Sequence, residues 1–456
     1  MSTTSQATPS SQGEQAQQKP PSLWQLLKRK EVFGWTMYDW ANSAFPMIMM
    51  SSILPIYYYK VAGANLPGNH ATVYWAYTTS IALFIVALIS PIVGAMADFS
   101  GAKKRYLTGF ALLGILGSAL LYGVYSGDWL KASIFFIIGN VGFAGANVFY
   151  DSLLPHVAAE NERDMVSAAG YAMGYLGGGL LLAISLGLIM TAPDEKVGFY
   201  TRLSFLLTAI WWLVFMIPLW KWVPEPERRV LPNEVGMNPV QAGFSRLLTT
   251  FRKVKRYDEL WKFLLAFWLY NDGIGTIIKM ATIYGTEIGI DSNTLIATLL
   301  MIQFVGIPFS FFFGWLAGKI GTKKAIYITL GVYTLISIGG YFMSQAWHFW
   351  LLGFGVATVQ GGSQALSRSL FSQMVPKSQS SEFFGFFSVS SKFAGIFGPL
   401  LFGFVGQLMG SSRLSIVSIV IFFIIGGFIL TRVDVEEGMR VAREEEALLA
   451  EEAVAS

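Results

Sequence analysis

Three ionisable residues, Asp39, Asp272 and Lys392, lie within long apolar stretches of this 456-residue chain. An ionised side chain at the centre of a bilayer costs about 2.5 to 3.5 kcal/mol, so each of them needs a partner or a water-filled cavity. Carboxylates on one wall of a cavity and an ammonium group on another suit a zwitterionic ligand, and a carboxylate could also bind and release a proton. The alternative is that these residues form salt bridges or cap backbone groups and only hold helices together.

Neutral polar and aromatic residues in the same apolar stretches could complete a binding site. Their amides and hydroxyls supply hydrogen bonds, and tyrosine supplies an amphipathic wall. Buried polar groups in membrane proteins also hydrogen-bond between helices, so the same residues could act in packing alone. Besides the three charges, the candidates for binding substrate or a proton are Tyr38, Asn42, Tyr270, Asn271, Gln360 and Gln364.

The composition indicates what kind of structure must position these residues. Hydrophobic residues make up 54% of the chain and charged residues 13%, whereas soluble domains carry about 25% charged residues. Apolar runs of about twenty residues have the length of a helix that crosses a hydrocarbon core of about 30 Å. We therefore expect an all-α integral membrane protein.

The apolar runs predict twelve transmembrane helices in two sets of six. The first set is expected near residues 32–59, 73–97, 105–126, 129–152, 166–190 and 199–223. The second set is expected near residues 260–287, 293–317, 323–344, 347–371, 382–408 and 413–432. This map divides the chain into a disordered N-terminal tail (1–22), a six-helix bundle (23–223), a linker (224–259), a second six-helix bundle (260–432) and an acidic tail (433–456).

The lysines and arginines predict the orientation of the helices. Most of the 32 fall on one side of the predicted membrane, including the basic residues of the linker. Positive residues accumulate on the cytoplasmic side, so we expect both termini and the linker in the cytoplasm of a plasma or inner membrane. The basic residues on the opposite side are Lys60, Lys131, Lys196, Arg202 and Arg413.

Several kinds of chemistry find no support in the sequence. The chain has no cysteine, which excludes disulfides and thiolate sites, and it lacks a G-x-x-x-x-G-K-[ST] phosphate-binding loop. Its three histidines, His70, His156 and His348, lie far apart at predicted loops or helix ends and are expected at the surface. We expect no enzyme activity, no cofactor and no metal, and the net charge of +4 does not indicate nucleic acid.

A repeated loop relates the two predicted bundles. The segment 94–104, GAMADFSGAKK, recurs as GWLAGKIGTKK at 314–324, with two glycines, an alanine and both lysines at matching positions. The first copy contains the gating candidates Gly94, Asp98, Gly101, Lys103 and Lys104. Glycines permit a tight turn between two spans and lysines stay near the headgroups, so the repeat indicates two duplicated halves.

This repeat resembles the loops between helices 2 and 3 and between helices 8 and 9 of the major facilitator superfamily. The resemblance implies a fold of two pseudo-symmetric six-helix bundles. It also implies that Asp98 helps to lock the cytoplasmic side shut through contacts with the opposite half. The second copy has Gly318 at the acidic position, so the resemblance implies this latch for the first half only.

Longer strings narrow the resemblance to one branch of the superfamily. They are GWTMYDWANSAF at 34–45, YNDG at 270–273, QGGSQALSRS at 360–369 and EFFGFFSVSSKF at 382–393. The chain is similar, over about residues 30–430, to the branch that contains the autophagy-linked vacuolar amino-acid effluxers and their bacterial relatives. The resemblance implies export of small molecules, with amino acids as the first substrate class.

Two further cationic residues are gating candidates. Arg368 lies eight residues before Pro376, and Asn147 lies eight residues before Pro155, which suggests equivalent positions in the two halves. Asp151, one turn after Asn147, could therefore meet Arg368 as a cytoplasmic gate, unless Arg368 only extends toward the headgroups.

Lys279 follows Asp272 by two helical turns on the outer side, and could pair with Glu287 or form an outer gate.

These observations predict a secondary active transporter that works by alternating access, an exporter of amino acids or similar metabolites with possible proton coupling. The expected partners are a small-molecule substrate, a coupling ion and the lipid bilayer, with a monomer as the expected state. Import, or transport of another amphiphile such as a peptide, drug or lipid, is one alternative. A transport-inactive scaffold or receptor is another, although charges deep in the membrane argue against it.

Overall fold

The computed structural model describes residues 22–67, 70–227, 234, 236–252, 256–290, 292–393, 395, 397–409 and 412–454. Within these residues every regular element is a helix. Helices satisfy their own backbone hydrogen bonds, which is what a chain with this much apolar sequence requires in a hydrocarbon environment.

Six helical rods form the first half of the described chain. The first rod is α2 (Lys30–Asn42), which follows the short helix α1 (Leu23–Leu27) and continues through two π-helical turns and α3 (Ile53–Tyr57). Pro46 and Pro55 lie in this irregular stretch, where a missing N–H disturbs the α-helical ladder. The other rods are α4 (His70–Ser100), α5 (Lys103–Leu120), α6 (Trp129–Ser152), α8 (Arg163–Met190) and α9 (Val197–Phe215) with α10 (Ile217–Trp222); α7 (Leu154–Val157) is a short connector.

Six further rods form the second half. Two of them are interrupted: α16 (Ser380–Phe393) is followed by α17 (Phe397–Met409), and α18 (Ser412–Ser418) by α19 (Val420–Thr431). The continuous ones are α12 (Asp258–Glu287), α13 (Ser292–Ile320), α14 (Thr322–Tyr341) and α15 (Ala346–Gln373). The twelve rods of the described chain match the twelve predicted spans in order.

Seven helical segments among the described residues are long and apolar enough to cross a membrane by length and composition. The first and eleventh rods are interrupted, and α12 carries charged residues along its length. These features apply to three of the five rods that a criterion of length and hydropathy does not select; the other two are α14 and α15.

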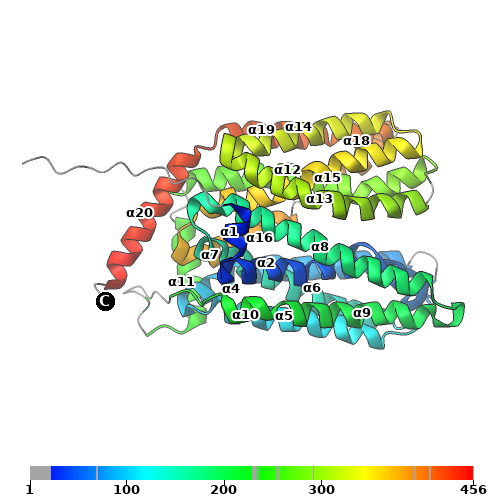
Figure 1. Ribbon diagram of the computed structural model, residues 1–456, viewed down its shortest axis with the longest axis horizontal. Coiled ribbons are helices and arrows are strands. Elements are labelled where there is room, and N and C mark those ends of the chain that lie inside the picture. The colour runs from blue at the N-terminus through cyan, green and yellow to red at the C-terminus, as the bar shows by residue number, and fades with distance from the viewer. Residues whose placement is uncertain are drawn as a thin grey trace, which may run out of the picture.

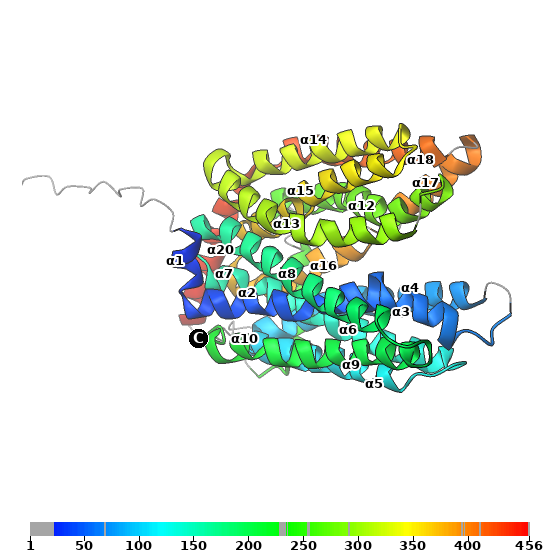
Figure 2. The ribbon, with the colours of Figure 1, turned by 45° about the vertical axis from the view of Figure 1, so that its right-hand side comes forward.

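The two halves lie side by side as separate bundles (Figures 1 and 2). One apolar core is built from residues of the first half, and a second is built almost wholly from residues of the second half. Between the bundles α4 packs along α16 and α8 packs along α13 and α15. The site described below lies where these helices meet.

Two helices outside the bundles lie at the same end of the molecule. The predicted linker contains α11 (Pro239–Arg252), which packs on α4, and the acidic tail forms α20 (Val435–Val454). Figure 1 shows α1, α11 and α20 gathered at this end, which we call the termini end. The Glu446 carboxylate in α20 accepts the backbone N–H and the hydroxyl of Ser378, each at 2.9 Å, so the tail helix is fastened to the second half.

Candidate functional site

Arg368 of α15 lies at the centre of a polar cluster between the two halves. The residue is only 2% exposed, and its guanidinium group donates to Asp151 at 3.0 Å and to Asp39 at 3.4 Å. It also donates to the hydroxyl and to the carbonyl oxygen of Ser167, both at 2.9 Å. Two carboxylates and a carbonyl therefore surround one buried cation that comes from the opposite half.

Asp39 reaches this cluster because α2 and α8 approach each other closely. Its Oδ2 atom also accepts the hydroxyl of Tyr150 at 2.8 Å. Gly170 of α8 makes room for the group, since a Cβ atom there would lie 2.6 Å from Asp39 Oδ2 and 3.0 Å from Arg368 Nη2. A glycine at this position is thus required by the space that the ion pair occupies.

Three aromatic rings complete the surroundings of Arg368. Its guanidinium carbon lies 4.4 Å from the ring centroid of Tyr171, 4.9 Å from that of Trp35 and 5.4 Å from that of Tyr150. The rings of Trp35 and Tyr150 stack on each other at 4.4 Å, and the Trp35 indole N–H donates to the Tyr150 carbonyl oxygen. This stacking fixes the position of the aromatic surface. Cations bind favourably to such aromatic faces within about 6 Å.

Asp151 and Arg368, which the proline spacing predicted as a pair, meet across the halves. The contact of Arg368 with Asp39 was not predicted. No local spacing links the two residues, because they are 329 positions apart and meet only when the halves pack. The gating role of this pair stays a prediction.

Asp98 contacts the opposite half, as its resemblance to the superfamily motif implied. Its carboxylate accepts the backbone N–H groups of Ser381 at 3.2 Å and Glu382 at 2.8 Å, at the beginning of α16. Lys103 lies 2.7 Å from Asp98 and donates to the Ser380 hydroxyl at 2.5 Å. A carboxylate at a helix N-terminus is stabilised by the unpaired N–H groups there.

The glycines and Lys104 of the same loop have different surroundings. A Cβ atom on Gly94 would lie 2.3 Å from the Ser381 carbonyl oxygen, so this glycine allows α4 and α16 to touch. Gly101 has a φ of 60° and turns the chain between α4 and α5. Lys104 donates to the carbonyl oxygens of Trp220 and Val223, which lie in its own half.

The second copy of the loop uses an acid from the other half. Gly318 lies at the position equivalent to Asp98, and a Cβ atom on it would have no neighbour within 4 Å among the described residues. Thr322 of this loop donates its hydroxyl to Asp164 of α8 at 2.7 Å. Asp164 was not predicted from the sequence. It lies eight positions after His156, outside both copies of the repeated loop.

Asp272 was expected on the wall of a central cavity, but in the structure its carboxylate lies at the start of α17. Its carboxylate accepts the backbone N–H of Phe397 at 3.1 Å and that of Gly398 at 2.9 Å. It therefore caps the start of α17, which corresponds to the packing alternative given above. The structure does not bring Asp272 to Asp39.

Lys279 lies near the same helix break, with Nζ 3.4 Å from the carbonyl oxygen of Gly395. The predicted partner Glu287 and the candidate Lys392 lie in helices, but their side chains are outside the described part of the structure. Their predicted roles stay predictions.

The neutral candidates have three kinds of surroundings. Asn42 donates to Asn147 at 2.6 Å, and the Tyr270 and Ser367 hydroxyls lie 2.6 Å apart, so both residues connect helices within one half. The buried Tyr38 hydroxyl has no hydrogen-bond partner among the described residues. Asn271, Gln360 and Gln364 are partly exposed.

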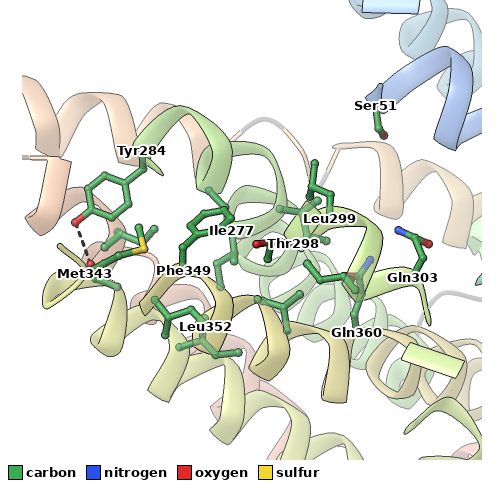
Figure 3. A pocket seen from close by; sticks show the side chains of 18 of the residues that line it. Ser51, Ile277, Tyr284, Thr298, Leu299, Gln303, Met343, Phe349, Leu352 and Gln360 are labelled. Carbon is green, nitrogen blue, oxygen red and sulfur yellow. Dashed lines mark hydrogen bonds between the residues drawn. The ribbon is translucent and has the colours of Figure 1, made fainter. Parts of the chain in front are cut away.

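Gln360 lines a cavity of about 140 Å³ whose walls come mostly from α12, α13, α14 and α15 of the second half. Met47, Ser51, Ser52 and Leu182 of the first half complete the lining. Figure 3 shows Tyr284, Met343 and Phe349 at one end of it and Gln303, Gln360 and Ser51 at the other. None of the described residues that line it is charged. The cavity is thus apolar at one end and carries amides at the other.

The expected surface position of His156 is wrong. Its Nε2 atom lies 3.2 Å from Lys103 Nζ and 3.4 Å from the Ser380 hydroxyl, between the two halves. The connector α7 turns back at Pro155 and places this helix-end residue against α16 instead of in solvent.

Comparisons with known proteins agree on the class. Double-tryptophan mutants of XylE match with a TM-score of 0.68 at 14% identity, covering 92% of this chain and 98% of theirs. A bacterial homologue of the iron transporter ferroportin matches with a TM-score of 0.64 at 11% identity, covering 90% and 99%. The fold is that of the major facilitator superfamily.

Relatives by sequence identify the family. The model of the family described as "Vacuole effluxer Atg22 like" matches residues 68–443, and the chain belongs to this family. The uncharacterized MFS-type transporter YxiO of Bacillus subtilis (strain 168) is 38% identical over 93% of this chain and 100% of its own length. Autophagy-related protein 22 of Coccidioides immitis (strain RS) is 22% identical over 91% of this chain and 88% of its own. The protein is therefore an integral membrane transporter of the major facilitator superfamily and not an enzyme.

Proposed function

We propose that this transporter exports amino acids or similar zwitterionic metabolites by alternating access, with both termini in the cytoplasm. The observation that carries the proposal is the buried cluster in which Arg368 of one half meets Asp39 and Asp151 of the other. When the bundles separate, the cation can bind the carboxylate of a zwitterion and the two carboxylates can bind its ammonium group, in place of their contacts with one another.

Movement of the halves is required because the contacts at the termini end connect them directly. Asp98 holds the beginning of α16, and Arg163 of α8 donates to the Ser372 carbonyl oxygen in α15 at 2.6 Å. A path through this end exists only after such contacts break, as expected for a rocking transition. The described conformation is then the state closed toward the cytoplasm, with the orientation taken from the positive residues.

Proton coupling belongs to the same proposal. Asp39 carries a carboxylate in the interface between the halves, where separation of Arg368 would leave it without its cation. Binding a proton would then neutralise a charge that is costly to leave unpaired in the membrane. Asp272 is a second candidate, although its carboxylate already accepts two backbone N–H groups.

Flux through purified protein in liposomes tests the proposal. Vesicles loaded with labelled amino acids, one at a time, should release them faster than protein-free vesicles, and a pH gradient should change the rate. Asp39→Asn should reduce this flux while the protein stays folded by circular dichroism. No flux for any amino acid, with or without a gradient, would remove the substrate assignment.

A second candidate substrate class follows from the cavity lined by Gln360. Its apolar end and its amide-bearing end suit an uncharged amphiphile better than a free zwitterion. The same vesicles loaded with a fluorescent single-chain amphiphile test this class. Release of the amphiphile without release of any amino acid would favour it over the first.

A further inference from the structure

The groups that hold Arg368 come from the half to which it does not belong. Its described hydrogen-bond acceptors, Asp39, Asp151 and Ser167, lie on α2, α6 and α8. The three rings around its guanidinium group lie on the same three helices. The first half therefore contains a complete cation site, and the second half supplies the cation.

We propose that this site, formed by Trp35, Asp39, Tyr150, Asp151 and Tyr171, is a receptor for the guanidinium or ammonium group of a cationic substrate. While the termini end is closed, the guanidinium group of Arg368 occupies this receptor in place of the substrate cation. The inference builds on the proposed function, since it names the substrate group that enters the site when the halves separate. Basic amino acids and amines are the class with such a group.

Charge determines this choice of class. With Arg368 in place, 12% and 20% of the Asp39 and Asp151 side chains are exposed. Withdrawal of Arg368 removes its positive charge from two largely buried carboxylates, so a ligand cation is favoured there and a ligand carboxylate is repelled. A side chain without charge, such as that of leucine, would gain contact with the rings but would not replace the charge of Arg368.

Geometry favours a planar cation. The guanidinium N–H groups of Arg368 donate to Asp151 and Ser167, and the guanidinium carbon lies over the Tyr171 ring at 4.4 Å. A substrate guanidinium can reproduce both sets of contacts, whereas an ammonium group reproduces the charge but not the planar fork of N–H donors. Competition between the substrate cation and Arg368 also links binding to opening, because only one of the two fits the site at a time.

Arg368→Ala tests the receptor directly by emptying it. Butylguanidinium, the probe, should raise the thermal midpoint of the purified variant and change the tryptophan fluorescence, and butylurea, its uncharged analogue, should do neither. Wild-type protein should bind butylguanidinium about tenfold more weakly or worse, because Arg368 fills the site. Trp35→Phe in the same background should remove the fluorescence change but keep the thermal shift.

Arg163→Ala is the matched control. Arg163 is also 2% exposed and also crosses between the halves, where it donates to the Ser372 carbonyl oxygen. Truncation of the Arg163 side chain also leaves a buried space between the halves, but this space lacks the three rings that surround Arg368. Butylguanidinium should not stabilise this variant, and equal stabilisation of both variants would overturn the proposal.

Flux in wild-type vesicles keeps the inference testable if Arg368→Ala fails to fold. L-arginine should be transported in preference to L-citrulline, which has the same shape without the charge. Transport of both at equal rates would overturn the receptor and leave the transport proposal standing. Specific binding of butylguanidinium to Arg368→Ala without any amino-acid flux would support the receptor and contradict the proposed function.

Discussion

The Asp272 carboxylate of α12 accepts the backbone N–H of Gly398 at 2.9 Å, where α17 begins. The contact is so close that a Cβ atom on Gly398 would lie 2.8 Å from Asp272 Oδ1 and 1.7 Å from the Thr276 hydroxyl. An acid inside a membrane helix thus fastens a break in a neighbouring helix, and its negative charge is stabilised by unpaired N–H groups.

Loss of this cap should reduce stability. We expect Asp272→Ala to cost about 1 to 2 kcal/mol, because it leaves two N–H groups at a helix start without an acceptor. Gly398→Ala should also lower the thermal midpoint, since its methyl group has no space. Gly403→Ala, in the same helix with nothing within 4 Å, is the control and should leave the midpoint unchanged. A lowered midpoint for Gly403→Ala as well would contradict this explanation.

The space around Gly170 gives a second prediction. A methyl group there would lie 2.6 Å from Asp39 Oδ2 and 2.9 Å from the Tyr150 hydroxyl. We expect Gly170→Ala to displace the ion pair and to reduce flux about tenfold or more, because a barrier increase of about 1.4 kcal/mol has that effect. Gly187→Ala on the same helix, with open space around it, should keep wild-type flux. Normal flux in Gly170→Ala would show that the cluster does not take part in transport.

Energetic coupling between Arg368 and Asp39 is the third prediction. Arg368→Gln should lower the free energy of unfolding by about 3 to 5 kcal/mol, because it leaves buried carboxylates without a cation. The double variant with Asp39→Asn should lose less than the two single variants together, with a coupling of about 0.5 to 3 kcal/mol. The pair of Arg29, whose side chain is 42% exposed, and Glu162, at 2.7 Å, provides the comparison, and Arg29→Gln should cost about 1 kcal/mol or less. Additive losses at Arg368 and Asp39 would rule out a direct interaction.

The sequence predicted the fold well because long apolar runs and a repeated loop are local signals. The run lengths predicted twelve spans, and the repeated loop predicted the two halves. The latch at Asp98, in the first copy only, stays a prediction. The pairing of Arg368 with Asp151 was also accessible, because both lie at a fixed distance from a proline.

Contacts that depend on packing between the halves could not be predicted in this way. Asp39 was expected in a cavity with Asp272 and Lys392, yet it pairs with Arg368, which no spacing connects to it. The cap that Asp272 forms was not predicted for a related reason, since it depends on a break between α16 and α17. The glycines near this break were noticed, but they do not reveal which residue accepts the freed N–H groups.

The asymmetry of the two loop copies gives the fourth prediction. Asp98→Asn should weaken the hold on Ser381 and Glu382, and it should shift the protein toward a state open at the termini end. Protease sensitivity of that end or labelling of cysteines placed near Ser381 would measure the shift. Gly318→Asp, which adds an acid in open space at the equivalent position, should leave the accessibility unchanged. Equal effects of the two substitutions would contradict a specific role for Asp98.

The distance between the halves at the termini end tests the central claim most directly. The chain has no cysteine, so spin labels can be attached at Arg105→Cys in α5 and Lys324→Cys in α14, two exposed positions at this end in different halves. Double electron–electron resonance spectroscopy should give one short distance between the two spin labels when Arg368 is intact. It should give a second, longer distance when Arg368→Ala removes the bridge or when a transported substrate is added. A single distance that stays the same under all three conditions would contradict alternating access governed by this cluster.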